Sequence, residues 1–211
     1  MASISSPYGL KPVNLIGGMP YAGSTRNIPI ASGYASNIYF GSVVYVTAAG
    51  VLNIVTGTGA DATTNAWPVG SSGTTGAIGV FVGCSYTNPS TKQKVFSQYW
   101  PTGTVAADAV GIVVDDDRTV FQVQCAGTAT SAALGTNFFF SAAQSTSTGS
   151  TATGNSTSAV VAEASAVTTT APFRCVGFVD MVGFSSVGDA YTDILVKFNP
   201  GWHSYSCVAG L

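Results

Sequence analysis

The chain has 211 residues, of which 46% are hydrophobic and only 8% are charged. A soluble domain usually has about 25% charged residues, so roughly fifty would be expected at this length. The net charge of -2 and the lack of a basic stripe exclude an electrostatic nucleic-acid groove. Such a neutral surface suits a chain that packs against other chains, because it loses little solvation when it is covered.

Length and composition predict one strand-rich domain. The many Gly, Val, Thr, Tyr and Phe residues favour strands and turns over helices. No run of 18 apolar residues is present, so we expect no spanning helix and no membrane partner. The first residues lack a charged region followed by an apolar run, so we expect no Sec-type signal.

The pattern of residues 1–35 is typical of an extended N-terminal arm. Four prolines interrupt any helix or central strand in this segment: Pro7, Pro12, Pro20 and Pro29. Glycines add turns between short apolar pairs such as Leu15-Ile16. Two alternatives remain open, an arm that reaches a neighbouring subunit and a segment that wraps its own domain. Residues 36–211 are expected to form the β-rich domain.

From residue 38 onward the pattern changes to strands. Apolar and β-branched runs predict strands over 38–40, 43–47, 51–55, 77–86, 94–100, 109–114, 119–125, 173–180 and 192–198. Gly50 indicates a hairpin turn between the second and third of these. We also expect 77–86 to pair with 94–100, and 109–114 to pair with 119–125 around a turn at 115–118.

The second half of the chain contains a long low-complexity stretch. Residues 131–141 are expected to hold one helical turn before Phe138. Residues from about 143 to 170 are dominated by Ser, Thr, Ala and Gly, which predicts a long exposed loop or a marginal edge ribbon. About eight strands and almost no helix predict an all-β fold, a β-sandwich or a β-barrel-like domain with an extended N-terminal arm.

No pattern in the chain indicates catalysis. Asp115-Asp116-Asp117 is the one carboxylate cluster, and it lacks the spacing of a calcium loop, so we interpret it as a turn with Arg118 as counter-ion. His203 is the single histidine, and no nucleophile motif accompanies it, so we expect a structural role. We therefore predict no catalytic residue, no metal site and no cofactor, and a protein that is not an enzyme.

Aromatic residues leave an alternative open. Five aromatic residues are compatible with a carbohydrate-binding platform, although such residues more often lie in a core or a subunit interface: Trp67, Tyr99, Trp100, Trp202 and Tyr205. A carbohydrate-binding surface module or a glycan hydrolase is therefore the alternative function. The hydrolase would require a cleft that joins Asp residues to these tryptophans.

Four cysteines are present, at positions 84, 125, 175 and 207. Neither a CxxC pair nor a Cys/His metal spacing occurs among them. Without a secretion signal we expect reduced, buried thiols that behave as small hydrophobic residues.

Several segments in roughly the first 125 residues resemble the capsid decoration or cement proteins of some short-tailed bacteriophages, including cyanophages. The resembling segments are Ser-Pro-Tyr-Gly-Leu-Lys-Pro-Val at 6–13, Tyr-Ala-Gly-Ser-Thr-Arg at 21–26, Gly-Cys-Ser-Tyr-Thr-Asn-Pro at 83–89, Phe-Ser-Gln-Tyr-Trp-Pro at 96–101, Val-Asp-Asp-Asp at 114–117 and Phe-Gln-Val-Gln at 121–124. None of these motifs is catalytic.

The resemblance implies a β-rich oligomer on the outer face of an icosahedral head, made in the cytoplasm of a bacterial host. Its partners would be the major capsid protein and further copies of itself, with a homotrimer favoured and a homodimer possible. No nucleic acid is expected as a partner. The candidate interface residues in the resembling segments are Pro7, Tyr8, Leu10, Tyr21, Arg26, Tyr99 and Trp100.

Overall fold

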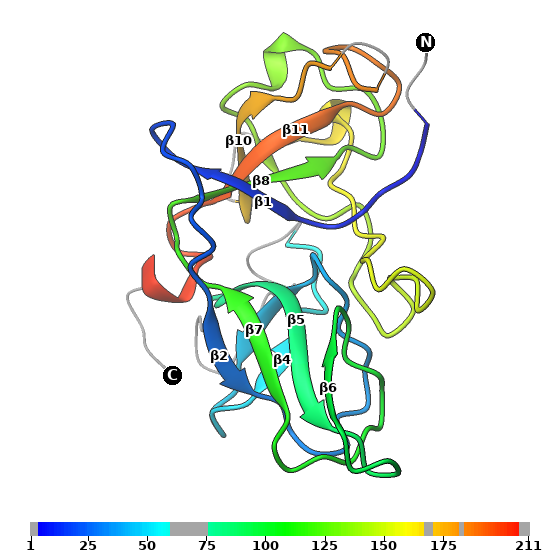
Figure 1. Cartoon of the computed structure of the whole chain (residues 1–211). Helices are drawn as coiled ribbons and strands as arrows, with labels where there is room; N and C mark the ends of the chain where they lie inside the picture. The colour runs from blue at the N-terminus through cyan, green and yellow to red at the C-terminus, as the bar shows by residue number, and fades with distance from the viewer. Residues whose placement is uncertain (1–3, 60–75, 167–170, 182–183, 207–211) are drawn as a thin grey trace.

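The computed structural model describes residues 4–59, 76–166, 171–181 and 184–206. Across these residues two antiparallel sheets pack together, and no α-helix is present (Figure 1). The predicted all-β fold is confirmed, and the arrangement is that of a β-sandwich. Trp67, one of the residues considered for a carbohydrate-binding platform, and the fourth cysteine, Cys207, lie outside the described residues.

One sheet has five strands and covers the core with one face. In spatial order they are β1 (Lys11–Leu15), β8 (Thr119–Gln124), β11 (Asp193–Phe198), β10 (Phe173–Phe178) and β9 (Asn137–Phe138). Burial alternates along β11, where Ile194, Val196 and Phe198 are buried and the residues between them are partly exposed. This period of two places every second residue against the core.

The other sheet has six strands. Its main path is β2 (Arg26–Pro29), β7 (Val110–Val114), β5 (Gly79–Thr87), β3 (Val43–Val46) and β4 (Leu52–Ile54), and β6 (Lys94–Ser97) also pairs with β5. The predicted hairpin around Gly50 is confirmed by the pairing of Val46 with Leu52. The pairing of 77–86 with 94–100 is also confirmed, although β6 ends at Ser97.

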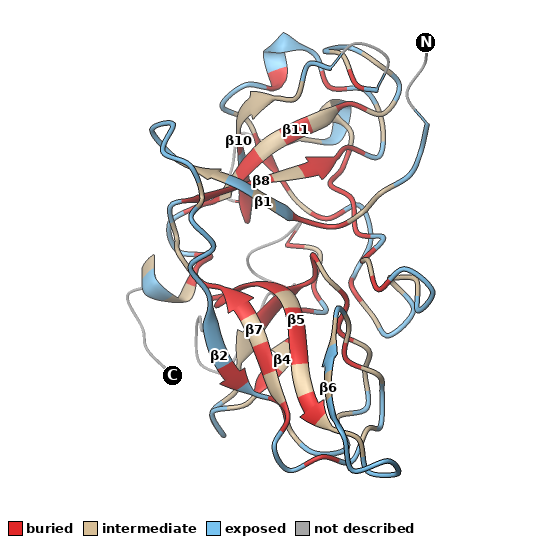
Figure 2. Ribbon diagram, viewed as in Figure 1, coloured by how far each residue is buried: buried red, intermediate tan, exposed pale blue. Residues whose placement is uncertain are grey.

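The central strands of the six-stranded sheet are buried on both faces. Val43 and Val80 belong to the core cluster between the two sheets, whereas the next residues in sequence, Val44 and Phe81, belong to a second cluster on the opposite face. Trp100 and other residues of the loops cover that second cluster. Figure 2 shows buried residues along β5 and β7 and exposed residues along β6. A strand covered on both faces reads as a continuous apolar run, as these strands do.

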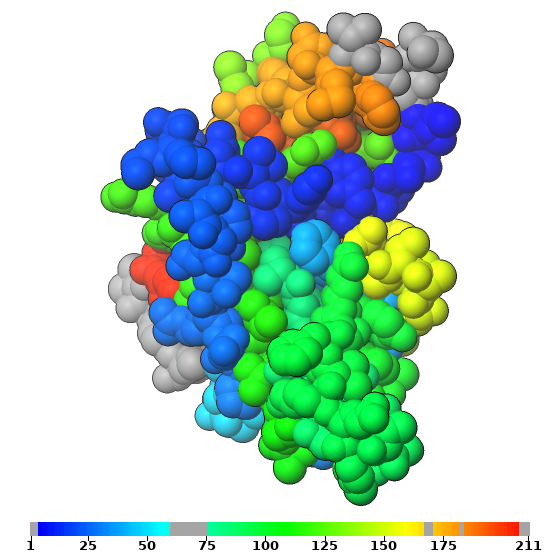
Figure 3. All heavy atoms as spheres, in the orientation of Figure 1, coloured from blue at the N-terminus to red at the C-terminus, as the bar shows by residue number. Residues whose placement is uncertain are grey.

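Residues 4–35 lie on the chain's own domain, which is one of the two alternatives for this segment. β1 pairs with β8 in one sheet and β2 pairs with β7 in the other, so the segment spans both sheets (Figure 3). Both strands lie at sheet edges, where Pro12 and Pro29 are tolerated because an edge strand leaves one side unpaired.

The expected pairing of 109–114 with 119–125 is wrong. β7 pairs with β2 and β5 in the six-stranded sheet, while β8 pairs with β1 and β11 in the five-stranded sheet. The turn at 115–118 therefore carries the chain from one sheet to the other. Such a crossing keeps Val114 and Phe121 in the same core cluster between the sheets.

The low-complexity segment is packed rather than exposed over much of its described part, residues 143–166. The side chain of Gln144 is buried, and its amide bonds the backbone of Val43 and of Val55. Ser156 and Val160 are also buried. Side-chain hydrogen bonds thus replace the regular strand pairing that a Ser/Thr-rich sequence disfavours. The expected helical turn is present as a 3-10 turn over Ser131–Ala133.

β5 and β7 approach each other closely at Gly79, and a substitution at this position tests that approach. A Cβ atom at Gly79 would overlap the carbonyl oxygen of Val114, so Gly79→Ala should lower the free energy of unfolding by about 3 kcal/mol in urea. Gly50→Ala is the control, since a Cβ there meets nothing within 4 Å and only its positive φ of 73° is strained. The control should lose about 1 kcal/mol. Equal losses would contradict this close approach.

Candidate functional site

The structure separates the seven candidate interface residues. Leu10 and Trp100 have exposed fractions of 0% and belong to the two core clusters. Trp100 also packs edge to face on Tyr86, with ring centroids 5.3 Å apart. The prediction is corrected for both residues, because a side chain in the chain's own core offers no surface to a partner.

Tyr99 and Pro7 are half-buried. The Tyr99 ring stacks on Tyr39 with centroids 5.7 Å apart. In the preceding residue, the side-chain amide of Gln98 donates to Asn155 Oδ1 over 2.6 Å. Tyr99 is therefore held just after the end of β6, beside the low-complexity segment.

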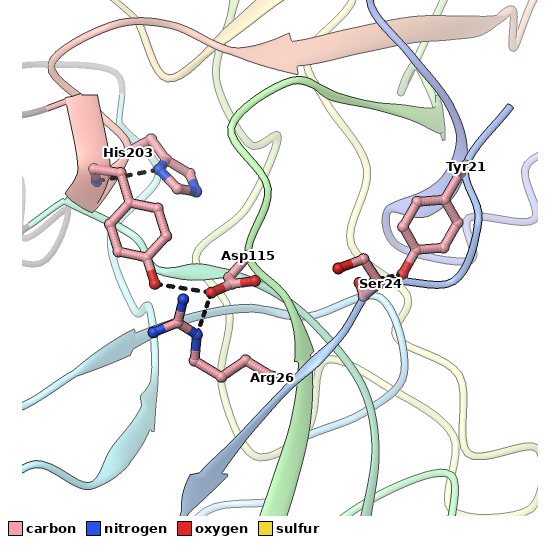
Figure 4. A network of polar contacts seen from close by, with 6 residues as sticks. Tyr21, Ser24, Arg26, Asp115 and His203 are labelled. Carbon is pink, nitrogen blue, oxygen red and sulfur yellow. Dashed lines mark hydrogen bonds and ion pairs between the residues drawn. The ribbon is translucent and has the colours of Figure 1, made fainter. Parts of the chain in front are cut away.

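Arg26 joins a polar network at the C-terminal turn (Figure 4). Its Nε lies 2.6 Å from Asp115 Oδ2, and the Tyr205 hydroxyl donates to the same oxygen over 2.8 Å. The guanidinium also lies 5.5 Å from the centre of the Tyr205 ring. The Arg26 side chain is 60% exposed and that of Asp115 only 12%, so the arginine is the part of this network that a partner would meet.

The three aspartates turn toward different groups. Asp116 accepts a hydrogen bond from the backbone N–H of Arg118 over 2.8 Å, and Asp117 accepts one from the Ser206 hydroxyl over 3.1 Å. The local turn is confirmed, but the counter-ion of Asp115 is Arg26 rather than Arg118. No group of three or more His, Cys, Asp or Glu in the described part of the chain could hold a metal ion.

Two phenols near this network are held in their protonated form. Burial and the carboxylates of Asp115 and Asp116 raise the pKa of Tyr21, which donates its hydroxyl to the Ser24 carbonyl over 2.8 Å (Figure 4). Burial and the hydrogen bond to Asp115 raise the pKa of Tyr205 to about 12. Both hydroxyls are therefore donors at neutral pH.

His203 lies under the same turn and is a structural residue, as expected. It is 1% exposed, and its Nδ1 accepts the backbone N–H of Tyr205 over 3.3 Å. Backbone hydrogen bonds between Ala77 and the residues on either side of His203 fix the turn against the six-stranded sheet. A small pocket of about 270 Å³ lies between Arg26, Ile78 and Tyr205.

Tyr8 lines a larger pocket of about 380 Å³. The other lining residues are Lys11, Phe40, Gln122, Asn155, Phe184 and Asp193. Sequence reasoning found Tyr8 alone. A usable signal was the alternation of Gln122 and Gln124 with Phe121 and Val123, which places the two amides on the outer face of the sheet.

Several large apolar side chains are exposed in the N-terminal segment, and others are exposed elsewhere on the described surface, such as Phe96, Leu134 and Phe184. Val13, Ile16 and Met19 have exposed fractions of 43%, 44% and 66%, and we call these three residues the N-terminal apolar edge. They lie on β1 and on the turn that follows it. Sequence reasoning noted only the pair Leu15-Ile16 here, because isolated apolar residues between glycines and prolines show no periodicity.

The aromatic residues considered as a carbohydrate platform do not form one in the described residues. Trp100 and Trp202 are buried, and Tyr205 contacts Arg26 and Asp115. Cys84, Cys125 and Cys175 are free and buried, as predicted, and burial raises the pKa of the Cys125 thiol to about 12. No helix within the described ranges is long and apolar enough to cross a membrane.

His203 gives the stability of the chain a defined pH dependence. Burial lowers the pKa of His203, and the carboxylates of Asp115 and Asp117 oppose this only in part. The unfolded chain therefore binds a proton that the folded chain releases, so stability is complete above the ordinary pKa of about 6.5 and decreases as the pH falls below it.

We expect the free energy of unfolding in urea to be lower near pH 5.5 than near pH 7.5. The chain has one histidine, so His203→Gln should remove this difference. Equal free energies at the two pH values in the unmodified chain would show that His203 has the same pKa in both states.

Comparison of the chain with protein-family models, with curated proteins and with solved structures finds no match.

Proposed function

We propose that the chain is a capsid decoration or cement protein of a tailed bacteriophage. In this role it binds the outer face of the icosahedral head and stabilises contacts between subunits of the major capsid protein. The observation that supports the proposal is the neutral surface. The chain has 7 Lys and Arg and 9 Asp and Glu over 9645 Å² of surface, about one charge per 600 Å². An ordinary composition would give one per roughly 190 Å².

Two ion pairs neutralise part of this small charge. Arg26 pairs with Asp115, and Lys94 pairs with Asp108 over 2.8 Å. The pair of Lys94 and Asp108 is exposed, so it contributes little to stability. Both pairs reduce the unpaired charge that would have to be desolvated when a neighbouring subunit covers this surface.

The N-terminal apolar edge supplies apolar area for such a contact. Each Å² of apolar surface that is covered stabilises a contact by about 25 cal/mol, and a stable interface buries roughly 1,200–2,000 Å². A copy that buries this surface across a seam between capsid subunits opposes their separation. The stabilising free energy comes from the burial of apolar surface, and no covalent bond forms or breaks.

The resemblance in the first 125 residues supports the same proposal, with the major capsid protein and further copies of the chain as partners. Closed symmetric oligomers are the rule, and a capsid offers both twofold and threefold positions, so a homotrimer and a homodimer both fit; we take the homotrimer as the first choice and the homodimer as the second. The alternative of a carbohydrate module or a hydrolase built on tryptophans has less support. Trp100 and Trp202 are buried, and neither of the two pockets described above is lined by a tryptophan.

Binding to heads that lack the protein tests the proposal. The purified chain should form a trimer or dimer by light scattering, and it should co-sediment with empty heads at a saturating copy number set by the capsid symmetry. The double variant Ile16→Ser/Met19→Ser removes apolar area from two exposed positions, so it should fold normally and bind heads about tenfold more weakly.

The matched control is Leu134→Ser, because Leu134 is also exposed but follows the 3-10 turn at Ser131–Ala133. The control should bind as the unmodified chain does. A stable monomer that does not co-sediment with heads would contradict the proposed function. Equal weakening by both variants would contradict the role of the N-terminal apolar edge.

A further inference from the structure

We propose that the pocket beside Tyr8 binds a neutral, hydroxyl-rich ligand such as one pyranose unit of a polysaccharide. This inference does not depend on the proposed function. The pocket occupies about 380 Å³, within the range of about 300–1,000 Å³ in which ligand sites fall. It differs from the tryptophan platform considered from the sequence, because its aromatic residues are tyrosine and phenylalanine.

The outer face of the five-stranded sheet forms the polar wall of this pocket. Gln122 on β8 lies between Phe121 and Val123, which both belong to the core cluster, so its side chain points away from that core. Asp193 is the first residue of the neighbouring strand β11. The Gln122 amide donates to Asp193 Oδ2 over 3.1 Å, which fixes the two side chains relative to each other.

Two buried polar atoms on residues that line the pocket lack a hydrogen-bond partner among the described residues. They are the Tyr8 hydroxyl and Asp193 Oδ1. The hydroxyl lies close enough to Asp193 and Gln122 for both to affect its pKa, but neither contact has the geometry of a hydrogen bond. Burial, followed by the Asp193 charge, raises the pKa of Tyr8, so its hydroxyl remains a donor. Leaving such buried groups unpaired is unfavourable, so a ligand that pairs with them is stabilised.

A ligand hydroxyl satisfies both atoms at once. It accepts from the Tyr8 O–H and donates to Asp193 Oδ1, whereas an ammonium group has no lone pair for Tyr8. A carboxylate or phosphate would be repelled by Asp193. Lys11 also lines the pocket and offsets the aspartate charge, so the formal charge of the lining is zero. These groups together favour a neutral ligand with several hydroxyls.

The rim of the pocket offers further contacts of the kind that a sugar ring uses. The Asn155 carbonyl oxygen already accepts from Gln98, so the amide N–H groups of Asn155 are the donors left for a ligand. Phe184 is 76% exposed, so its ring is accessible to a ligand in the pocket. The phenyl ring provides an apolar face for the C–H groups of a pyranose, while the hydroxyls of the sugar contact the polar wall of the pocket.

An NMR titration of the full chain tests the inference. The probes are the methyl glycosides of glucose, galactose and mannose, with sodium acetate and methylammonium chloride as charged probes. At least one glycoside should give saturable amide shifts confined to the residues around the pocket, and neither charged probe should do so. Phe184→Ala and Tyr8→Phe should each weaken the binding about tenfold.

Phe96→Ala is the matched control, because Phe96 is 79% exposed on β6 and lies outside the pocket lining. It should leave the affinity unchanged. Three outcomes would overturn the inference: no glycoside saturates the chain, a charged probe binds as well as the glycosides, or Phe96→Ala weakens binding as much as Phe184→Ala does. Because Phe184 is exposed, its replacement by alanine leaves the core intact.

Discussion

Burial of the central strands of the six-stranded sheet on both faces is the constraint that organises the rest of the chain. Val43 and Val44 are neighbours in sequence but belong to different core clusters, and the same is true of Val80 and Phe81. The five-stranded sheet covers one face. Loops and the bridge between Ile38 and Trp100 cover the other. Because both faces need a cover, a large part of the chain outside the strands is packed against them.

The segments that cover the sheet contain uncharged polar groups, and these form hydrogen bonds with one another and with the backbone. The Gln144 amide bonds the backbone of Val43 in β3 and of Val55 just after β4, and Ser156 and Ser158 bond each other and their own backbone. Hydroxyl and amide groups can pair in this way at little cost in desolvation, whereas buried charges require strong partners. The outer surface is equally poor in charge, which leaves apolar side chains such as Ile16 and Phe184 as its most distinctive groups.

The strands could be predicted from the sequence where local pattern decides them. Val43–Val46 and Gly79–Thr87 are continuous apolar runs, as expected for strands covered on both faces. The pairing of β7 was not predictable in this way, because a turn at 115–118 has the same composition whether it closes a hairpin or crosses between sheets. The edge strands of the first 35 residues were missed as well, since prolines argue against central strands but are tolerated at edges.

The candidate site shows the same limit. Tyr8, Tyr21 and Arg26 were selected in the sequence, but their partners were not, because Tyr205 is 90 positions from Asp115 and no local spacing records that contact. Leu10 and Trp100 were selected as surface residues and are core residues, because a large apolar side chain looks the same in either role. Burial depends on long-range packing, which the residue type alone does not determine.

The salt dependence of binding to empty phage heads is the most direct test of the central claim, that this chain works through the burial of a neutral surface. Raising the salt from about 0.05 M to about 1 M screens charge pairs but leaves burial intact or strengthens it. The account predicts an affinity that stays constant or increases over this range. An affinity that falls steeply with salt, or no binding at any salt concentration, would contradict it.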